Sequence, residues 1–301
     1  MAEIARTSSS HIRVGRLTVW LVVVGAVCAA AAADYQQGWL SGLNGWESVL
    51  PMESLVLAVL ALGCEFVDAT IGMGYGTTLT PLLILMGYPI AVIVPCAVVS
   101  QLVGNVSAAF FHQREGNVDF LRDTKARNAA LVIGGAGLIV AVGTVLLAVR
   151  LSPGVLKGAV SVCILGVGLF LLAGSRFKMK YRLRNVAALG AVAGFNKAFS
   201  GGGYGPLVCG GQVLAGLDVR AAVGTTALAE AIVCTATAAT YLASGSLIPL
   251  AVLVPLTVGS VLSTPVSAMA LRRLPTSVAR KLMGAAVVTL GVLAVLRVVN
   301  T

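Results

Sequence analysis

Two stretches of this chain read Gly72-Met73-Gly74-Tyr75-Gly76 and Gly201-Gly202-Gly203-Tyr204-Gly205. Each is followed by a short apolar segment, 76–88 in the first case and 206–217 in the second. At 1.5 Å per residue such a segment rises roughly 18 Å, whereas the hydrocarbon core of a bilayer is roughly 30 Å thick. The two stretches therefore predict helix breaks, each followed by a half-helix.

The two stretches belong to an internal repeat with an offset of 129 residues. The Gly-Tyr-Gly sequences match at this offset, and a colinear series of residues matches on both sides of them. The flanking matches are Phe66 with Phe195, Ala69 with Ala198, Gly72 with Gly201, Gly87 with Gly216 and Gly116 with Gly245.

The composition is that of a helical membrane protein. Of the 301 residues, 58% are hydrophobic and 11% are charged, and the mean hydropathy is +0.96. The apolar runs have helical length and lack the alternation of an outer-membrane barrel, so we expect an all-α polytopic protein. The net charge of +10 lies in loops between apolar runs, which the positive-inside rule explains without nucleic acid.

The apolar windows predict eleven membrane segments, and several are too short to cross alone. The count therefore lies between seven spans with two re-entrant hairpins and eleven short spans. We divide the chain into an N-terminal helix with an outer loop (1–51), a first repeat (52–174), a basic linker (175–185) and a second repeat (186–301). The segments are 17–33, 52–71, 76–88, 89–111, 128–149, 155–174, 186–199, 206–217, 219–242, 247–271 and 281–299.

Loop charges predict the orientation in the plasma membrane. Lysines and arginines of the linker, of residues 272–281 and of the N-terminus favour the cytoplasm, which makes the first hairpin (52–88) begin outside and its counterpart (186–217) begin inside. We thus expect two inverted-topology repeats, a cytoplasmic N-terminus and an uncleaved first helix. The small residues Ala29 to Ala33 leave a cleaved signal peptide open as the alternative.

Inverted repeats with helices broken near the midplane are a plan of secondary transporters. A glycine tip exposes backbone N–H groups, and the half-helix that follows directs its positive dipole end to the same place, which favours an anion. The alternative is that the glycines only allow close helix packing. The tip residues of the predicted substrate site are Gly72, Gly74, Tyr75, Gly76, Thr77, Ser200, Gly201, Gly202, Gly203 and Tyr204.

Four ionisable residues, Glu65, Asp68, Lys197 and Glu230, lie deep in predicted spans and are candidates for function. Asp68 and Lys197 are equivalent at the repeat offset, so a two-fold axis would bring them together as an ion pair. Lys197 would attract the anion while Asp68 accepts a proton or releases the lysine; alternatively the pair only holds the hairpins together.

Two more polar residues of the helices after the hairpins belong to the predicted site. Gln101 is the repeat counterpart of Glu230, and with Asn105 it predicts a polar cavity wall. For Glu230 an interhelical hydrogen bond is the alternative. We assign coupling to a proton or sodium gradient to Asp68, Glu65 and Glu230.

The stretch from Gly72 to Leu83, with Thr77-Thr78 and Pro81, and the loop from His112 to Asp119 resemble the TauE/SafE sulfite exporter family. The resemblance covers most of the chain, including the second glycine stretch after the basic linker. It implies export or uptake of small sulfur-containing or carboxylated anions, such as sulfite, sulfoacetate or other organosulfonates, without ATP. The chain departs from the family pattern by its extra N-terminal helix, by the loop 34–51 and by Thr77-Thr78.

Two readings of other classes compete with anion transport. An intramembrane enzyme would use Ser200 as nucleophile with Lys197 as its base, and a cation carrier would use the intramembrane carboxylates alone. No cofactor or metal is expected, because the six cysteines occur singly in apolar segments and the chain has only two histidines. The sequence does not fix the oligomeric state.

Overall fold

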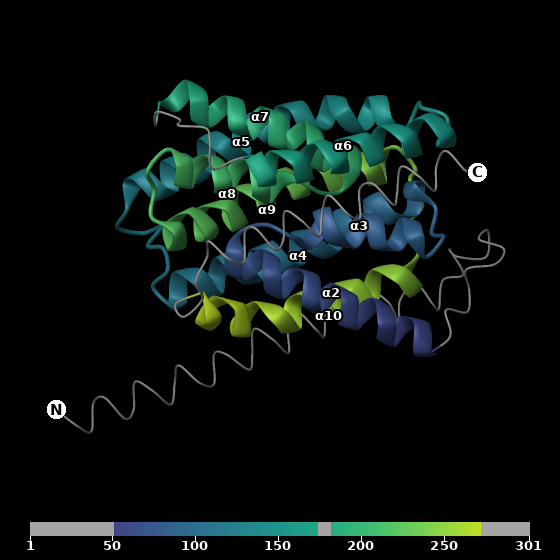
Figure 1. Cartoon of the computed structure of the whole chain (residues 1–301), viewed down its shortest axis with the longest axis horizontal. Helices are drawn as coiled ribbons and strands as arrows, with labels where there is room; N and C mark the ends of the chain where they lie inside the picture. The colour runs from purple at the N-terminus through teal and green to yellow at the C-terminus, as the bar shows by residue number, and fades with distance from the viewer. Residues whose placement is uncertain (1–50, 174–181, 272–301) are drawn as a thin grey trace. The chain divides into compact units, whose positions relative to one another are not determined.

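The computed structural model describes residues 51–173 and 182–271, and within these ranges every regular element is an α-helix (Figure 1). Two of the nine helices, α3 and α8, have only 11 residues each. The helices are α2 (Pro51–Ile71), α3 (Tyr75–Leu85), α4 (Ile90–Arg114), α5 (Thr124–Ala148), α6 (Pro153–Ala173), α7 (Leu183–Ser200), α8 (Tyr204–Leu214), α9 (Val219–Ala243) and α10 (Leu250–Ala270).

Nine of the eleven predicted segments correspond to these helices, while 17–33 and 281–299 lie outside the described residues. The prediction of an all-helical chain is confirmed for the part that the structure describes. Boundaries differ by a few residues, most at α5, which begins four residues before the predicted 128. The carboxylate of Asp123 accepts from the backbone N–H groups of Lys125 and Ala126, so the capped first turn is polar and escapes a search for apolar windows.

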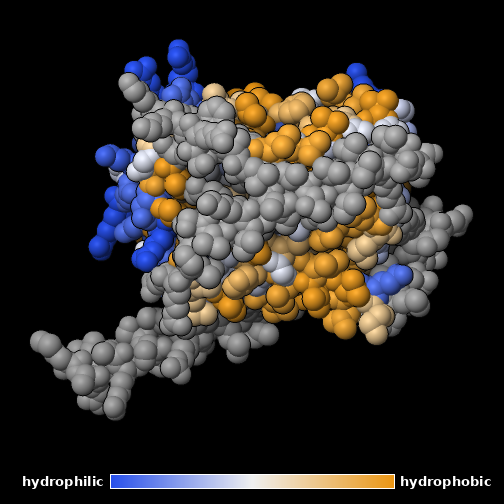
Figure 2. Space-filling view, viewed as in Figure 1, coloured by the Kyte–Doolittle hydropathy of each residue, from blue (hydrophilic) through white to orange (hydrophobic). Residues whose placement is uncertain are grey.

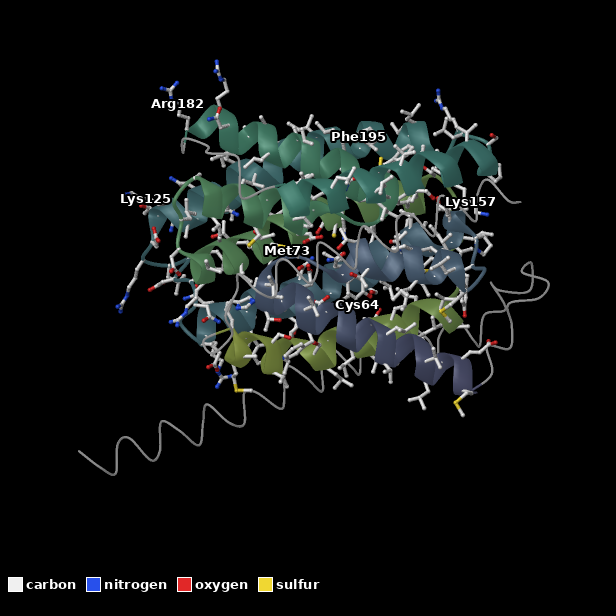
Figure 3. All side chains as sticks on the ribbon, viewed as in Figure 1. Cys64, Met73, Lys125, Lys157, Arg182 and Phe195 are labelled. Carbon is white, nitrogen blue, oxygen red and sulfur yellow. The ribbon has the colours of Figure 1, made fainter. Side chains whose placement is uncertain are left out.

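The chain is a multi-pass membrane protein. Five helices, α2, α4, α5, α9 and α10, are long and apolar enough to cross a bilayer. Where the face in Figure 2 is coloured, hydrophobic side chains fill its middle part, and hydrophilic ones gather towards the ends. Lys125 and Arg182 lie at one end, here called the basic end, and Lys157 lies at the opposite end (Figure 3).

The helix bounds repeat at the offset of 129 residues. Tyr75 and Tyr204 begin α3 and α8, Ile71 and Ser200 end α2 and α7, and α4 corresponds residue for residue to α9. Packing follows the same correspondence, because α2 lies along α10 as α7 lies along α5, and α4 contacts α9. Four more glycines with positive φ follow the ends of α3, α4, α8 and α9 in two matched pairs: Gly87 and Gly216, Gly116 and Gly245.

The two glycine tips pack against each other backbone to backbone. A methyl group added to Gly76 would overlap the carbonyl oxygen of Gly201 and the Cα of Gly202. In the matching contact, a methyl group on Gly205 would overlap the carbonyl oxygen of Gly72. Any side chain at either position would therefore push the two tips apart.

We predict that Gly76→Ala and Gly205→Ala each destabilise the protein by about 1–3 kcal/mol or more, the usual range for overpacking a buried contact. Melting of the purified proteins in detergent, followed by intrinsic fluorescence, measures the loss as a lower Tm. Gly210→Ala on α8 is the matched control, since nothing lies within 4 Å of an added methyl group there. A Gly76→Ala protein that melts with the control would contradict the close tip contact.

Candidate functional site

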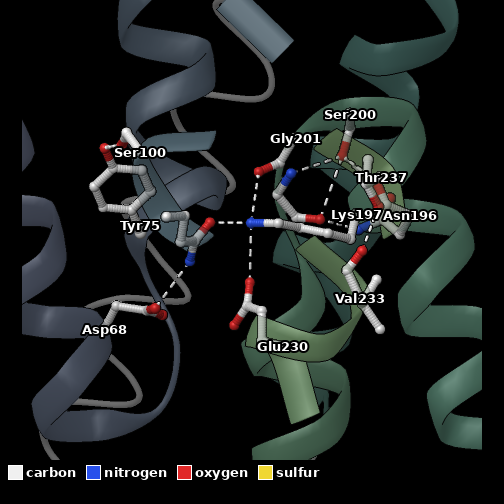
Figure 4. A network of polar contacts seen from close by, with 12 residues as sticks. Asp68, Tyr75, Ser100, Asn196, Lys197, Ser200, Gly201, Glu230, Val233 and Thr237 are labelled. Carbon is white, nitrogen blue, oxygen red and sulfur yellow. Dashed lines mark hydrogen bonds and ion pairs between the residues drawn. The ribbon is translucent and has the colours of Figure 1, made fainter. Parts of the chain in front are cut away.

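Lys197, in the last turn of α7, is fully buried and forms the centre of a polar network (Figure 4). Its ammonium group donates to the side-chain oxygen of Gln101, to the carbonyl oxygen of Gly201 at 3.2 Å and to Glu230 Oε1 at 2.9 Å. An ammonium group has three N–H donors, and these three acceptors engage all of them. A bound anion must therefore replace one of the three.

Gln101 connects Lys197 to Asp68. The amide accepts from Lys197 through its oxygen and donates from Nε2 to Asp68 Oδ2 at 3.1 Å. The sequence predicts an ion pair between Asp68 and Lys197, but the structure pairs Lys197 with Glu230 and places Gln101 in between. The reason is geometric, because Gln101 and Glu230 occupy equivalent positions of α4 and α9, and both side chains reach the space between the tips.

The two tips differ in what lies against the half-helix that follows. At the first tip, the carboxyl group of Asp68 faces the backbone N–H of Tyr75 and so already occupies the N-terminus of α3. At the second tip, the residue equivalent to Asp68 is the cation Lys197. The N-cap residues of α3 and α8 are both glycines, Gly74 and Gly203, which have no side chain to cap the helix.

The two tip tyrosines differ as well. The hydroxyl of Tyr75 forms a hydrogen bond with Ser100, whereas the fully buried hydroxyl of Tyr204 has no hydrogen-bond partner among the described residues. The repeat explains the difference, since Ala229 stands where Ser100 stands in the first copy. A buried hydroxyl without a partner costs about 1–3 kcal/mol. The second tip thus carries a donor that is free for a ligand.

The second tip is fixed by its own helix. Asn196 donates to the carbonyl oxygen of Gly202 at 3.0 Å, and the Ser200 hydroxyl donates to the carbonyl oxygen of Asn196 at 2.8 Å. Ser200 therefore holds the turn, and the Lys197 ammonium is directed to other acceptors. A serine nucleophile needs a base that takes its proton, and in this geometry Lys197 bonds other groups and does not serve as that base for Ser200.

A small cavity of about 10 Å³ lies beside the network, which is room for one water molecule. Asn105, one turn beyond Gln101 on α4, lines it together with Asp68, Thr226 and Glu230. The amide nitrogen of Asn105 has no hydrogen-bond partner in the described part of the chain. The space is too small for an oxyanion, so the site is closed in this structure.

A larger cavity of about 400 Å³ lies at the opposite end of the bundle. It is mostly apolar, and it is lined by Lys157, Tyr88, Tyr241 and, at the second tip, Phe199. Val94, another lining residue, is the neighbour that a methyl group on Gly201 would meet at 3.6 Å. Val94 and Phe199 thus line this cavity and lie beside the second tip.

Glu65 lies apart from this network. Its carboxyl group is fully buried beside Ser260 of α10, and neither of its oxygens has a hydrogen-bond partner among the described residues. The remaining first-tip residues, Gly72, Gly74, Gly76 and Thr77, are buried in the turn and first turn of α3.

The structure thus brings Asp68, Gln101, Lys197 and Glu230 into one network, with the tips and Asn105 beside it. Sequence reasoning missed Asn196 and Ser260. Asn196 could have been identified from the sequence, because it is a polar residue directly before Lys197 in a predicted span. Ser260 begins a series of hydroxyl residues at helical spacing within 250–270, a signal that the apolar character of this segment conceals.

Comparisons with known proteins agree on the kind of protein. The sequence model of the family described as "Sulfite exporter TauE/SafE" matches residues 55–294. The "Probable membrane transporter protein YtnM" of Bacillus subtilis (strain 168) is 31% identical over 205 residues, which cover 63% of this chain and 64% of that protein. The match thus spans less than two thirds of the relative's length. No solved structure matches the chain.

Breaking the Lys197–Glu230 pair from one side is predicted to destabilise the protein more than removing both partners. Lys197→Met leaves buried carboxylates without their cation, which costs about 3–5 kcal/mol for such a pair. Lys197→Met/Glu230→Met, with apolar side chains of similar volume, should recover much of that loss. Unfolding of the four proteins of this cycle in denaturant measures the coupling, and additive losses would contradict the pairing.

Proposed function

The chain belongs to the sulfite exporter TauE/SafE family, and from this premise we propose that it is a secondary transporter of a small sulfur-containing or organic anion. Sulfite and organosulfonates are the substrates we favour, and export is the favoured direction. The description of the relative as a probable membrane transporter supports the transport of a solute. Neither description is that of an enzyme.

The observation that carries the proposal is the buried cation at the second tip. A lysine inside the membrane is expensive and is typical of a substrate or ion pathway. Here it lies in the last turn of α7, just before the glycine turn that leads into α8, whose N-terminus begins at a glycine and carries a positive dipole end. Lys197, the backbone of Gly203 and the free hydroxyl of Tyr204 together offer an oxyanion a charge and several donors.

We place the anion at the second tip because Asp68 fills the corresponding place at the first. The first tip then serves as the surface against which the second tip closes. It consists of Gly72, Gly74, Tyr75, Gly76 and Thr77. At the second tip Ser200, Gly201 and Gly202 shape the turn. Gln101 and Asn105 form the wall, and Gln101 yields its bond to Lys197 when the anion arrives.

The two copies are proposed to be inverted repeats in the membrane. In support, α7 begins near Arg182 at the basic end, whereas α2 begins near Tyr88, which lines the cavity at the opposite end. Burial raises the pKa of the Tyr88 phenol, and the charge of Glu53 in the first turn of α2 raises it further. We place the protein in the plasma membrane. The positive-inside rule then puts the basic end and the N-terminus on the cytoplasmic side.

Transport requires the closed tips to separate. An inverted pair of repeats can open the space between them alternately to either side, with the site at the repeat interface. The cavity of about 400 Å³ then serves as a vestibule on the opposite, outer side, and Val94 and Phe199, which line it beside the second tip, would close it towards the site. No ATP site is needed, because Asp68, Glu65 and Glu230 supply carboxylates for coupling to a proton or sodium gradient.

A cation carrier is the second candidate. The observation in its favour is that the described part of the chain buries three carboxyl groups, Glu65, Asp68 and Glu230, and one lysine. In that case Lys197 would be a counter-ion only, and anions would leave the stability of the protein unchanged.

The two tyrosines provide a matched test of the anion site. Tyr204→Phe removes a donor that no described residue uses, so we expect the protein to be at least as stable and to bind its anion about tenfold more weakly or worse, since a hydrogen bond to a charged group contributes about 1.5–3 kcal/mol. Tyr75→Phe is the control, because its hydroxyl bonds Ser100. It should lower the Tm and leave anion affinity unchanged.

The measurement is the thermal stabilisation of purified protein by sulfite, thiosulfate, sulfonates, carboxylates and sodium chloride. One anion class should stabilise the wild type and Tyr75→Phe, less so Tyr204→Phe and not Lys197→Met. Stabilisation by sodium alone, unchanged in Lys197→Met, would favour the cation carrier and reject the anion site.

A further inference from the structure

The buried charges of the described core do not balance. Glu65, Asp68 and Glu230 are buried together with one cation, Lys197, so full ionisation leaves two excess negative charges inside the membrane. Glu230 pairs with Lys197, and Asp68 receives hydrogen bonds from Gln101 and faces the backbone of Tyr75. Glu65 has none of these contacts. An isolated carboxylate buried without partners costs far more free energy than its neutral form.

Glu65 lies in a polar recess between α2, α4 and α10. A methyl group on Gly104 of α4 would overlap the Ser260 hydroxyl and lie 3.2 Å from Glu65 Oε2, so the carboxyl and the hydroxyl are close neighbours across this glycine. The Ser260 hydroxyl, like both oxygens of Glu65, lacks a hydrogen-bond partner among the described residues. The recess therefore contains an acid and a hydroxyl that the fold leaves unused.

A stripe of hydroxyl groups leads from this recess towards the basic end. Ser260, Ser263, Thr264 and Ser267 are spaced i, i+3, i+4 and i+7 on α10 and are all buried, although a stripe facing lipid would be apolar. Thr264 forms a hydrogen bond of 2.7 Å with Ser107 of α4, and Ser263 and Ser267 lie 3.2 Å apart. The stripe extends about 10 Å along the helix at 1.5 Å per residue.

Two more buried polar residues continue the stripe at the basic end. Asn117 donates to the carbonyl oxygen of Ala268, one residue beyond Ser267, and lies 3.0 Å from His112 Nδ1. The Nε2 of His112 and the side-chain oxygen of Asn117 have no partner among the residues described. Hydroxyl, amide and neutral imidazole groups can each both donate and accept a hydrogen bond, which is the capacity that a proton relay requires of its members.

We propose that Glu65 is a proton-binding site that exchanges with the basic end through the hydroxyl stripe of α10, separately from the anion site at Lys197. The Glu65 carboxylate takes one proton from water at the basic end and becomes neutral. It later releases the proton to the basic end or to the opposite end of the bundle. A proton suits this recess better than a metal cation, which requires several oxygen ligands at once. The role as coupling site rests on the proposed transport function; the proton site itself does not.

Several titratable and charged groups face Glu65 from the elements around it. On α4 such groups lie only towards the basic end of the helix. The part of α10 that the structure describes contributes hydroxyl groups and no charged side chain. The groups near Glu65 are Cys64 and Asp68 of α2, Tyr75 of α3, Lys197 of α7, and Glu230 and Cys234 of α9, and on α4 His112 lies farther away, towards the basic end.

Infrared spectroscopy of the purified full chain tests the proton site without a substrate. We expect a C=O band of a buried, protonated carboxyl group at neutral pH that is lost in Glu65→Gln and kept in Glu53→Gln, which changes an exposed carboxylate of the same helix. Ser260→Ala should shift the band without abolishing it, because it changes the neighbour and leaves the acid. A band that persists in Glu65→Gln, or a wild type without one, would overturn the proposal.

Proteoliposomes test the coupling. With sulfite as probe, a pH gradient should drive uptake by the wild type, and Glu65→Gln should lose this response while it keeps sulfite exchange between the two sides. Gradient-driven uptake that survives in Glu65→Gln, or that follows sodium in place of protons, would overturn the coupling role. A wild type without any sulfite exchange would instead contradict sulfite as the substrate, and the infrared band would still decide the proton site.

Discussion

The contact between the two glycine tips is the constraint on which the rest of the structure depends. Gly76 meets Gly201 and Gly202, and Gly205 meets Gly72, with backbone against backbone and no space for a side chain. This contact fixes where α2 and α7 end and where α3 and α8 begin. It also places the side chains of the last helical turns, Asp68 and Lys197, at one depth in the bundle.

Differences between equivalent positions turn this repeated frame into a site. The first copy has Asp68, Ser100 and Gln101 where the second has Lys197, Ala229 and Glu230. At the first tip the carboxyl group of Asp68 and the bond between Tyr75 and Ser100 come from the protein itself, whereas the second tip has a cation and a tyrosine hydroxyl that no described residue bonds. We infer that the first copy supplies a rigid surface and the second supplies the ligands.

Much of this could be predicted from the sequence, because apolar length and glycine clusters directly reflect the requirements of a bilayer. The short helices, their glycine starts and the buried ionisable residues all followed from these patterns. The partner of Lys197 did not, since the repeat offset tells which residues are equivalent but not how far each helix is rotated. The hydroxyls of α10 were also missed, because serine and threonine barely lower the hydropathy of an apolar segment.

The position of a bound anion tests the central claim most directly. Selenite, the heavier analogue of sulfite, can be located by its anomalous scattering in crystals of the full chain. The account predicts a peak at the second tip, in contact with Lys197 and the N-terminus of α8, with the two tips moved apart. A peak at the first tip beside Asp68, or only among the arginines and lysines of the basic end, would contradict it.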